Sequence, residues 1–141
     1  MIVCIDTNTL LQGREPKHPF FPILDAVVAG RLTWALSNRI LTEYEEIVTA
    51  SAGPEAWRKL GRLMELIAAT TGTLLWISPH FQFRVISADP DDNAFTDCAI
   101  AANADYVITE DRHFAPLANA GYKPQPITPV KFIERYRGVQ V

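Results

Sequence analysis

Acidic side chains are concentrated in one stretch of the 141-residue sequence. Residues 89–111 hold seven of the 16 acids and neither Lys nor Arg, which leaves the rest of the chain formally at +4. Carboxylates held close together repel one another unless a cation neutralises them. Oxygen ligands without nearby His or Cys favour Mg²⁺ or Mn²⁺ over zinc. The seven acids are Asp89, Asp91, Asp92, Asp97, Asp105, Glu110 and Asp111.

Two apolar runs of the sequence end in acids. The run Ile2–Ile5 is followed by Asp6, and the run Tyr106–Thr109 is followed by Glu110 and Asp111. In open parallel sheets, ligands bind beyond the carboxyl ends of the strands, where the strand order reverses. A helix that precedes a parallel strand begins at the same edge, so the acids that open the helix predicted from residue 89 belong there too. We therefore expect Asp6, Asp92 and Asp111 to converge.

Each of these acids also has a purely structural interpretation. Asp6 could cap the helix that follows it, and Asp89 fits an N-cap better than a ligand. Asp91 fits a solvated acid of the first helical turn. Asp97 lies about 140° around an ideal helix from Asp92, so it is either a supporting group, a ligand of a second metal ion or an exposed polar position.

The helix predicted over residues 38–49 offers three further acids. Glu46 falls opposite the apolar stripe of this helix, whereas Glu43 and Glu45 flank the stripe. Helical periodicity cannot choose between Glu43 and Glu45.

Short apolar runs alternate with longer stretches of helical period, which predicts a parallel sheet flanked by helices. We expect the strand at Leu74–Ile77 to be a candidate for the centre of the sheet. The predicted strands are 2–5, 32–36, 74–77, 83–86, 106–109 and 126–127, and the predicted helices are 19–30, 38–49, 54–70, 89–103, 112–120 and 129–136.

Length and composition predict one soluble domain over residues 1–141. The chain is 48% hydrophobic, has no apolar run long enough to cross a membrane and shows no signal peptide, so we expect a cytoplasmic protein. Cys4 and Cys98 are too few for a disulfide framework, and we expect both to be buried.

Four segments, each in its predicted strand or helix context, follow one another in a characteristic order. They are Asp6-Thr7-Asn8, Leu36-Ser37 with Ile40-Leu41-Thr42-Glu43-Tyr44, Asp89-Pro90-Asp91-Asp92-Asn93 with Ala99-Ile100-Ala101-Ala102, and Ala104-Asp105-Tyr106-Val107-Ile108-Thr109-Glu110-Asp111. Together they closely resemble the PIN-domain family, and the likeness covers nearly the entire chain. It is nearest to the toxin components of toxin-antitoxin pairs, which are similar to VapC-type ribonucleases.

The resemblance implies a three-layer α/β/α fold with a central, mostly parallel twisted sheet and an acidic pocket that binds Mg²⁺ or Mn²⁺. It assigns catalytic and metal-binding roles to four acids, and among the helix acids it selects Glu43. Glu110 departs from the family, which commonly has a small residue there, and could alter metal occupancy or substrate approach. The implied ligands are Asp6, Glu43, Asp92 and Asp111, and the implied supporting residues are Asn8, Asp97 and Thr109.

The expected function is therefore Mg²⁺- or Mn²⁺-dependent hydrolysis of RNA phosphodiester bonds, as the toxin of a toxin-antitoxin pair. The expected partners are RNA, a cognate antitoxin and a second copy of the chain. A non-catalytic RNA- or antitoxin-binding module of the same fold is the alternative. A phosphohydrolase of the haloacid-dehalogenase kind fits poorly, because Asp6-Thr7-Asn8-Thr9 lacks its second acid. Candidate phosphate contacts are Arg14, Lys17, Arg39 and Arg112.

Overall fold

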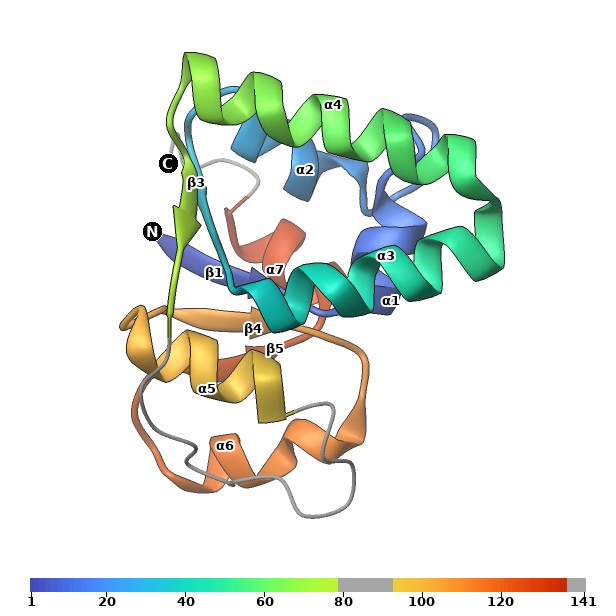
Figure 1. The fold of residues 1–141 in the computed structure, drawn as a ribbon. Coiled ribbons are helices and arrows are strands. Elements are labelled where there is room, and N and C mark those ends of the chain that lie inside the picture. The colour runs from blue at the N-terminus through green and yellow to red at the C-terminus, as the bar shows by residue number, and fades with distance from the viewer. Residues whose placement is uncertain (79–92, 137–141) are drawn as a thin grey trace.

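The structure, a computed structural model, describes residues 1–78 and 93–136 of the chain. A sheet of five strands forms the centre of this part. The strands are β1 (Ile2–Ile5), β2 (Thr33–Leu36), β3 (Leu74–Trp76), β4 (Tyr106–Ile108) and β5 (Gln125–Ile127). Their order is β3-β2-β1-β4-β5, and every pair is parallel (Figure 1). The predicted α/β class with a central parallel sheet is confirmed.

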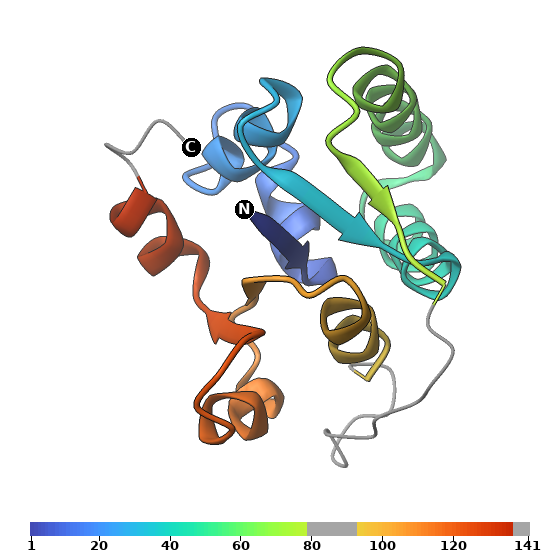
Figure 2. The ribbon, with the colours of Figure 1, turned by 90° about the vertical axis from the view of Figure 1, so that its left-hand side faces the viewer.

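Helices cover both faces of the sheet. They are α1 (Thr7–Gly13), α2 (Phe21–Val28), α3 (Asn38–Ala52), α4 (Pro54–Thr70), α5 (Asn93–Ala101), the 3₁₀ helix η2 (Arg112–Phe114), α6 (Ala115–Asn119) and α7 (Pro129–Tyr136). In Figure 1, α1 to α4 and α7 lie on one side of the strands, and α5 and α6 lie on the other. Figure 2 shows α7 and the α3–α4 pair at opposite sides of the molecule, with the strands between them.

Local sequence accounts for the boundaries of the α3–α4 pair. The Ser37 hydroxyl accepts a hydrogen bond from the Ile40 backbone N–H at 3.3 Å and caps α3. Gly53 separates the two helices with a φ of +94°, a backbone conformation that residues with a side chain rarely adopt. Pro54 then opens α4, where the missing N–H costs nothing.

The core lies on both sides of the strands. Residues of β1, β2 and β4 are buried as nearly continuous apolar runs, as expected for strands covered on both faces. A chain of aromatic rings links β2, α3, α5 and η2, with centroid separations of 5.8, 6.0 and 6.5 Å between successive rings. The four rings belong to Trp34, Tyr44, Phe95 and Phe114. These ring contacts hold α3 and α5 against the sheet.

Most predicted elements are present, but one placement is wrong. The strand predicted at Leu74–Ile77 was expected to be a candidate for the centre, whereas β3 lies at the edge and pairs with β2. The two positions beside β1 are taken by β2 and β4. After β3 the chain crosses to the other side of β1, where it forms β4. Half of the Trp76 side chain is accordingly exposed.

The predicted helices do not include α1, which the sequence indicates only as the helix that Asp6 could cap. Other differences concern helix ends. The helix predicted over residues 112–120 divides into η2 and α6 at Ala115. The candidate strand at residues 83–86 and the start of the helix predicted from Asp89 lie outside the described residues. Both Cys4 and Cys98 are buried and free, as predicted. Within residues 1–78 and 93–136, none of the helices combines the length and apolar character needed to cross a membrane.

Candidate functional site

Asp6 lies between the end of β1 and the start of α1, and its side chain is 7% exposed. Its Oδ1 accepts a hydrogen bond from the Thr7 backbone N–H at 2.8 Å, which makes Asp6 the N-cap of α1. Its Oδ2 accepts a hydrogen bond from the Thr109 hydroxyl at 2.6 Å. Asp6 is therefore both a helix cap and part of the rim formed by the strand ends.

The end of β4 meets Asp6 through Thr109. The Thr109 backbone N–H donates to the Ile127 carbonyl at 2.9 Å, which continues the pairing with β5. Its hydroxyl donates to Asp6 and accepts from the Asp111 backbone N–H at 2.9 Å. The hydroxyl thus joins a carboxylate on β1 to the backbone that carries the next acid.

Asp111 is held by the turn that follows it. Its Oδ1 accepts a hydrogen bond from the His113 backbone N–H at 2.9 Å and lies 3.3 Å from the Nδ1 of the same residue. The Asp111 side chain is 34% exposed, so it combines a fixed position with access to solvent. The structure therefore brings Asp6 and Asp111 together, as expected from the two strand ends, with Thr109 between them.

A cleft of about 280 Å³ opens beside these residues. It lies at the carboxyl ends of β1 and β4, where the strand order reverses, which is the usual ligand position in such sheets. No Lys or Arg is among the described residues that line it. Its three carboxylates are oxygen ligands of the type that hard divalent cations prefer. The cleft is lined by Asp6, Asn8, Thr9, Gln12, Glu110 and Asp111.

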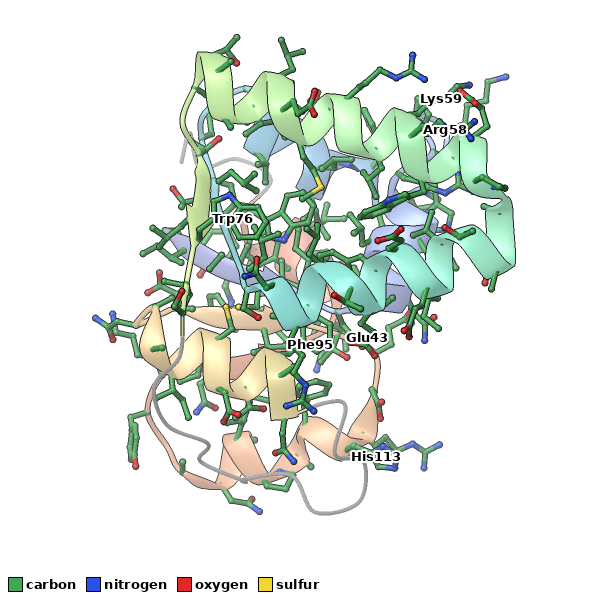
Figure 3. The ribbon with its side chains drawn as sticks, in the orientation of Figure 1. Glu43, Arg58, Lys59, Trp76, Phe95 and His113 are labelled. Carbon is green, nitrogen blue, oxygen red and sulfur yellow. The ribbon has the colours of Figure 1, made fainter. Side chains whose placement is uncertain are left out.

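Glu43 is distinguished from its neighbours on α3 by burial. It is half-buried, whereas Glu45 and Glu46 are exposed. Figure 3 shows Glu43 on the side of α3 that is turned toward Phe95 of α5. Packing therefore distinguishes Glu43 from Glu45, because it turns Glu43 inward.

Two other predicted acids have different outcomes. Asp97 on α5 is 5% exposed, which excludes the exposed alternative. Asp92, the fourth predicted ligand, lies outside the described residues. Within residues 1–78 and 93–136, no three His, Cys, Asp or Glu side chains are grouped closely enough to hold a metal ion.

Neither of two buried ionisable groups behind the site is suited to act as a nucleophile. Burial raises the pKa of Tyr44 well above its ordinary value, so its hydroxyl stays protonated and donates to the Ile5 carbonyl. A hydrogen bond with Cys98, followed by burial, raises the pKa of the Cys4 thiol well above its ordinary value. Both groups therefore contribute to packing in their neutral forms.

Sequence reasoning missed Thr9 and Gln12, which lie on α1 and line the cleft beside Asn8. Their position could have been inferred from helix geometry, because residues three and four apart share a helix face. The predicted phosphate contacts are absent from the lining of this cleft. Arg14 instead forms an ion pair with Glu15 at a separate cleft of about 550 Å³.

Thr109→Val should lower the free energy of unfolding by about 1–3 kcal/mol. The substitution keeps the shape of the side chain, but it removes the donor to Asp6 Oδ2 and the acceptor for the Asp111 N–H. Urea denaturation measures the change. Thr42→Val is the control, since its hydroxyl bonds only within an exposed part of α3, and it should change stability by less than about 0.5 kcal/mol. Equal effects of the two variants would contradict a buried role for the Thr109 hydroxyl.

Comparisons with known proteins agree with this fold. The family model described as PIN domain matches residues 2–113. The chain is similar in structure to the PIN domain of T. brucei RRP44, with a TM-score of 0.52 and 14% sequence identity. That likeness covers 95% of this chain and 79% of the other, and at this identity it supports the fold alone. A comparison with curated proteins gives no significant match.

Proposed function

The chain belongs to the PIN-domain family, and on this basis we propose that it is a metal-dependent ribonuclease that hydrolyses RNA phosphodiester bonds. The observation that carries the proposal is the Asp6–Thr109–Asp111 network beside a cleft whose described lining residues include no Lys or Arg. The proposed unit is a single PIN-like domain over residues 1–141.

The proposed ligands of Mg²⁺ or Mn²⁺ are Asp6, Glu43, Asp92 and Asp111. Asp6 and Asp111 line one cleft, and no Lys or Arg is among the described residues that line it. A divalent cation would supply Lewis acidity, which lowers the pKa of water and stabilises charge on the scissile phosphate. The metal would also remove the repulsion between the carboxylates and the phosphate of the substrate.

The proposed roles of the other residues follow from their contacts. The Thr109 hydroxyl orients Asp6, and the His113 backbone N–H holds Asp111. Asn8 is exposed at the cleft, where its amide can donate to and accept from the substrate. Asp97 is a buried supporting residue in this proposal. No side-chain nucleophile is required, because water attacks the phosphorus.

The experiment that tests the function is an assay of the purified protein on tRNA and ribosomal RNA. We expect cleavage with Mn²⁺ or Mg²⁺ and none with EDTA. Isothermal titration with Mn²⁺ in the absence of RNA should show binding at the acidic cleft. Cleavage that continues in EDTA would contradict the role of the metal, and absent cleavage under all conditions would contradict the ribonuclease.

Glu43→Gln should reduce metal-dependent cleavage by about a hundredfold, because it removes a charged oxygen ligand. Glu46→Gln is the matched control on the same helix, since Glu46 is exposed. Its cleavage rate should equal that of the wild type. Initial rates on one RNA at saturating Mn²⁺ measure both variants. Equal rates for the two variants would remove Glu43 from the proposed ligands.

We propose further that this ribonuclease is the toxin of a cytoplasmic toxin-antitoxin pair and that it forms a homodimer. The support is the resemblance of the four sequence segments to the toxin branch of the family. Expression of the chain should arrest growth, and co-expression of the product of an adjacent short reading frame should relieve the arrest. Light scattering of the purified protein should give the mass of two chains.

A non-catalytic RNA-binding module of the same fold is the second candidate. The observation behind it is Glu110, whose exposed carboxylate stands where the family commonly has a small residue and could alter metal occupancy. Binding of RNA without binding of Mn²⁺ would support this candidate over the ribonuclease.

A further inference from the structure

The two walls of the acidic cleft carry different hydrogen-bonding groups. Asn8 and Gln12 lie one turn apart on α1 and present amides, which donate and accept. Glu110 follows β4 and presents a carboxylate, which only accepts. All three side chains are exposed, and none of them forms a hydrogen bond or ion pair with another described residue. These groups are therefore available to a ligand.

The charge of the cleft restricts what that ligand can be. Asp6, Glu110 and Asp111 contribute carboxylates, and no described lining residue is basic. A phosphate is repelled from such a surface unless a metal ion stands between them. The wall that contains Glu110 instead suits a neutral group with several hydrogen-bond donors. Among the neutral parts of a ribonucleotide, the base carries the N–H donors, and single-stranded RNA exposes the edges of its bases to proteins.

The carboxylate of Glu110 distinguishes among the four bases. Guanine presents an N1–H and an N2 amino group side by side, so both donors can meet the two oxygens of one carboxylate. Adenine and cytosine pair their amino group with an accepting ring nitrogen, and uracil places one N–H between two carbonyls. Another edge of guanine carries the O6 and N7 acceptors. The side-chain amides of Asn8 and Gln12 can donate hydrogen bonds to these two atoms.

We infer that this cleft is a subsite for a guanine base, read by Glu110 on one edge and by Asn8 and Gln12 on the other. The inference rests on the proposed ribonuclease function for its place in the reaction, since the cleft borders Asp6 and Asp111. Glu110, which departs from the family pattern, then sets base preference. Cleavage is directed to the phosphate next to a guanine.

A nucleoside titration tests the subsite without relying on catalysis. Guanosine, inosine and adenosine are titrated in the absence of metal, and backbone amide shifts are followed by NMR. Inosine is guanosine without the 2-amino group, so it lacks one of the two donors. We expect shifts centred on residues 8, 12 and 110, and binding of guanosine about tenfold tighter than that of inosine. Guanosine that binds no more tightly than adenosine overturns the inference.

Two variants complete the test. Glu110→Gln replaces one accepting oxygen with a donor and should bind guanosine and inosine equally. Glu134→Gln, at an exposed acid of α7, should keep the wild-type ratio. A Glu110→Gln variant that retains the tenfold preference overturns the subsite.

Mapping the cleavage sites separates failure of the subsite from failure of the ribonuclease. Cleavage without guanine preference counts against the subsite alone. A guanosine preference in a protein that cleaves no RNA supports the subsite and counts against the proposed reaction.

Discussion

Asp6→Asn is expected to lower metal-dependent RNA cleavage by about a thousandfold. Asp6 contributes the most buried carboxylate of the acidic cleft, and its two oxygens are oriented by Thr7 and Thr109. An asparagine keeps the size of the side chain but presents one neutral oxygen, which is a much weaker ligand for Mg²⁺ or Mn²⁺. Single-turnover rates on one RNA, with Mn²⁺ at increasing concentrations, measure the loss.

The fold should survive this substitution. The asparagine oxygen can still accept from the Thr7 N–H, and Asn is as good an N-cap as Asp. Loss of a negative charge beside Glu110 and Asp111 also relieves repulsion in the metal-free protein. Asp25→Asn is the control, because Asp25 is an exposed acid of α2, and its cleavage should be unchanged. A folded Asp6→Asn variant with undiminished cleavage would refute the metal mechanism.

The acids of residues 89–111 show which parts of the site could be predicted from sequence. Asp105 and Asp111 flank the same strand, β4, at opposite ends. Asp105 accepts a hydrogen bond from the Ile2 backbone N–H at 3.0 Å and lies 3.7 Å from Lys123, so it stabilises the amino end of the sheet. Asp111 lies at the carboxyl end with the cleft. Strand direction is readable from sequence, and it places the two acids at opposite ends of the strand, as the structure does.

Other parts of the site depend on contacts between distant segments, which a sequence pattern cannot supply. Glu43 and Glu45 flank the apolar stripe of α3 equally, and only the packing of α3 near α5 distinguishes them. Asp97 could face solvent or the core, and the position of α5 over β1, β2 and β4 buries it. The edge position of β3 likewise follows from the strand order, which alternation of apolar runs does not determine.

Tyr44→Phe is expected to lower the free energy of unfolding by about 2–4 kcal/mol. Tyr44 is fully buried on α3. Its hydroxyl donates to the Ile5 carbonyl, one residue before Asp6, and accepts from the Trp34 indole N–H at 3.3 Å. Phenylalanine fills the same space but leaves both buried partners without this hydroxyl. Each unsatisfied buried group costs about 1–3 kcal/mol, and the longer Trp34 contact contributes the smaller share.

Urea denaturation of Tyr44→Phe and Tyr122→Phe gives the measurement and its control. The Tyr122 side chain is 73% exposed, so loss of its hydroxyl should change stability by less than about 0.5 kcal/mol. The Tyr44 hydroxyl also holds the backbone that carries Asp6, and we therefore expect weaker Mn²⁺ binding by the folded Tyr44→Phe protein. If the two variants prove equally stable, the Ile5 carbonyl and the Trp34 indole do not depend on Tyr44, and α3 is tied to the site by apolar packing alone.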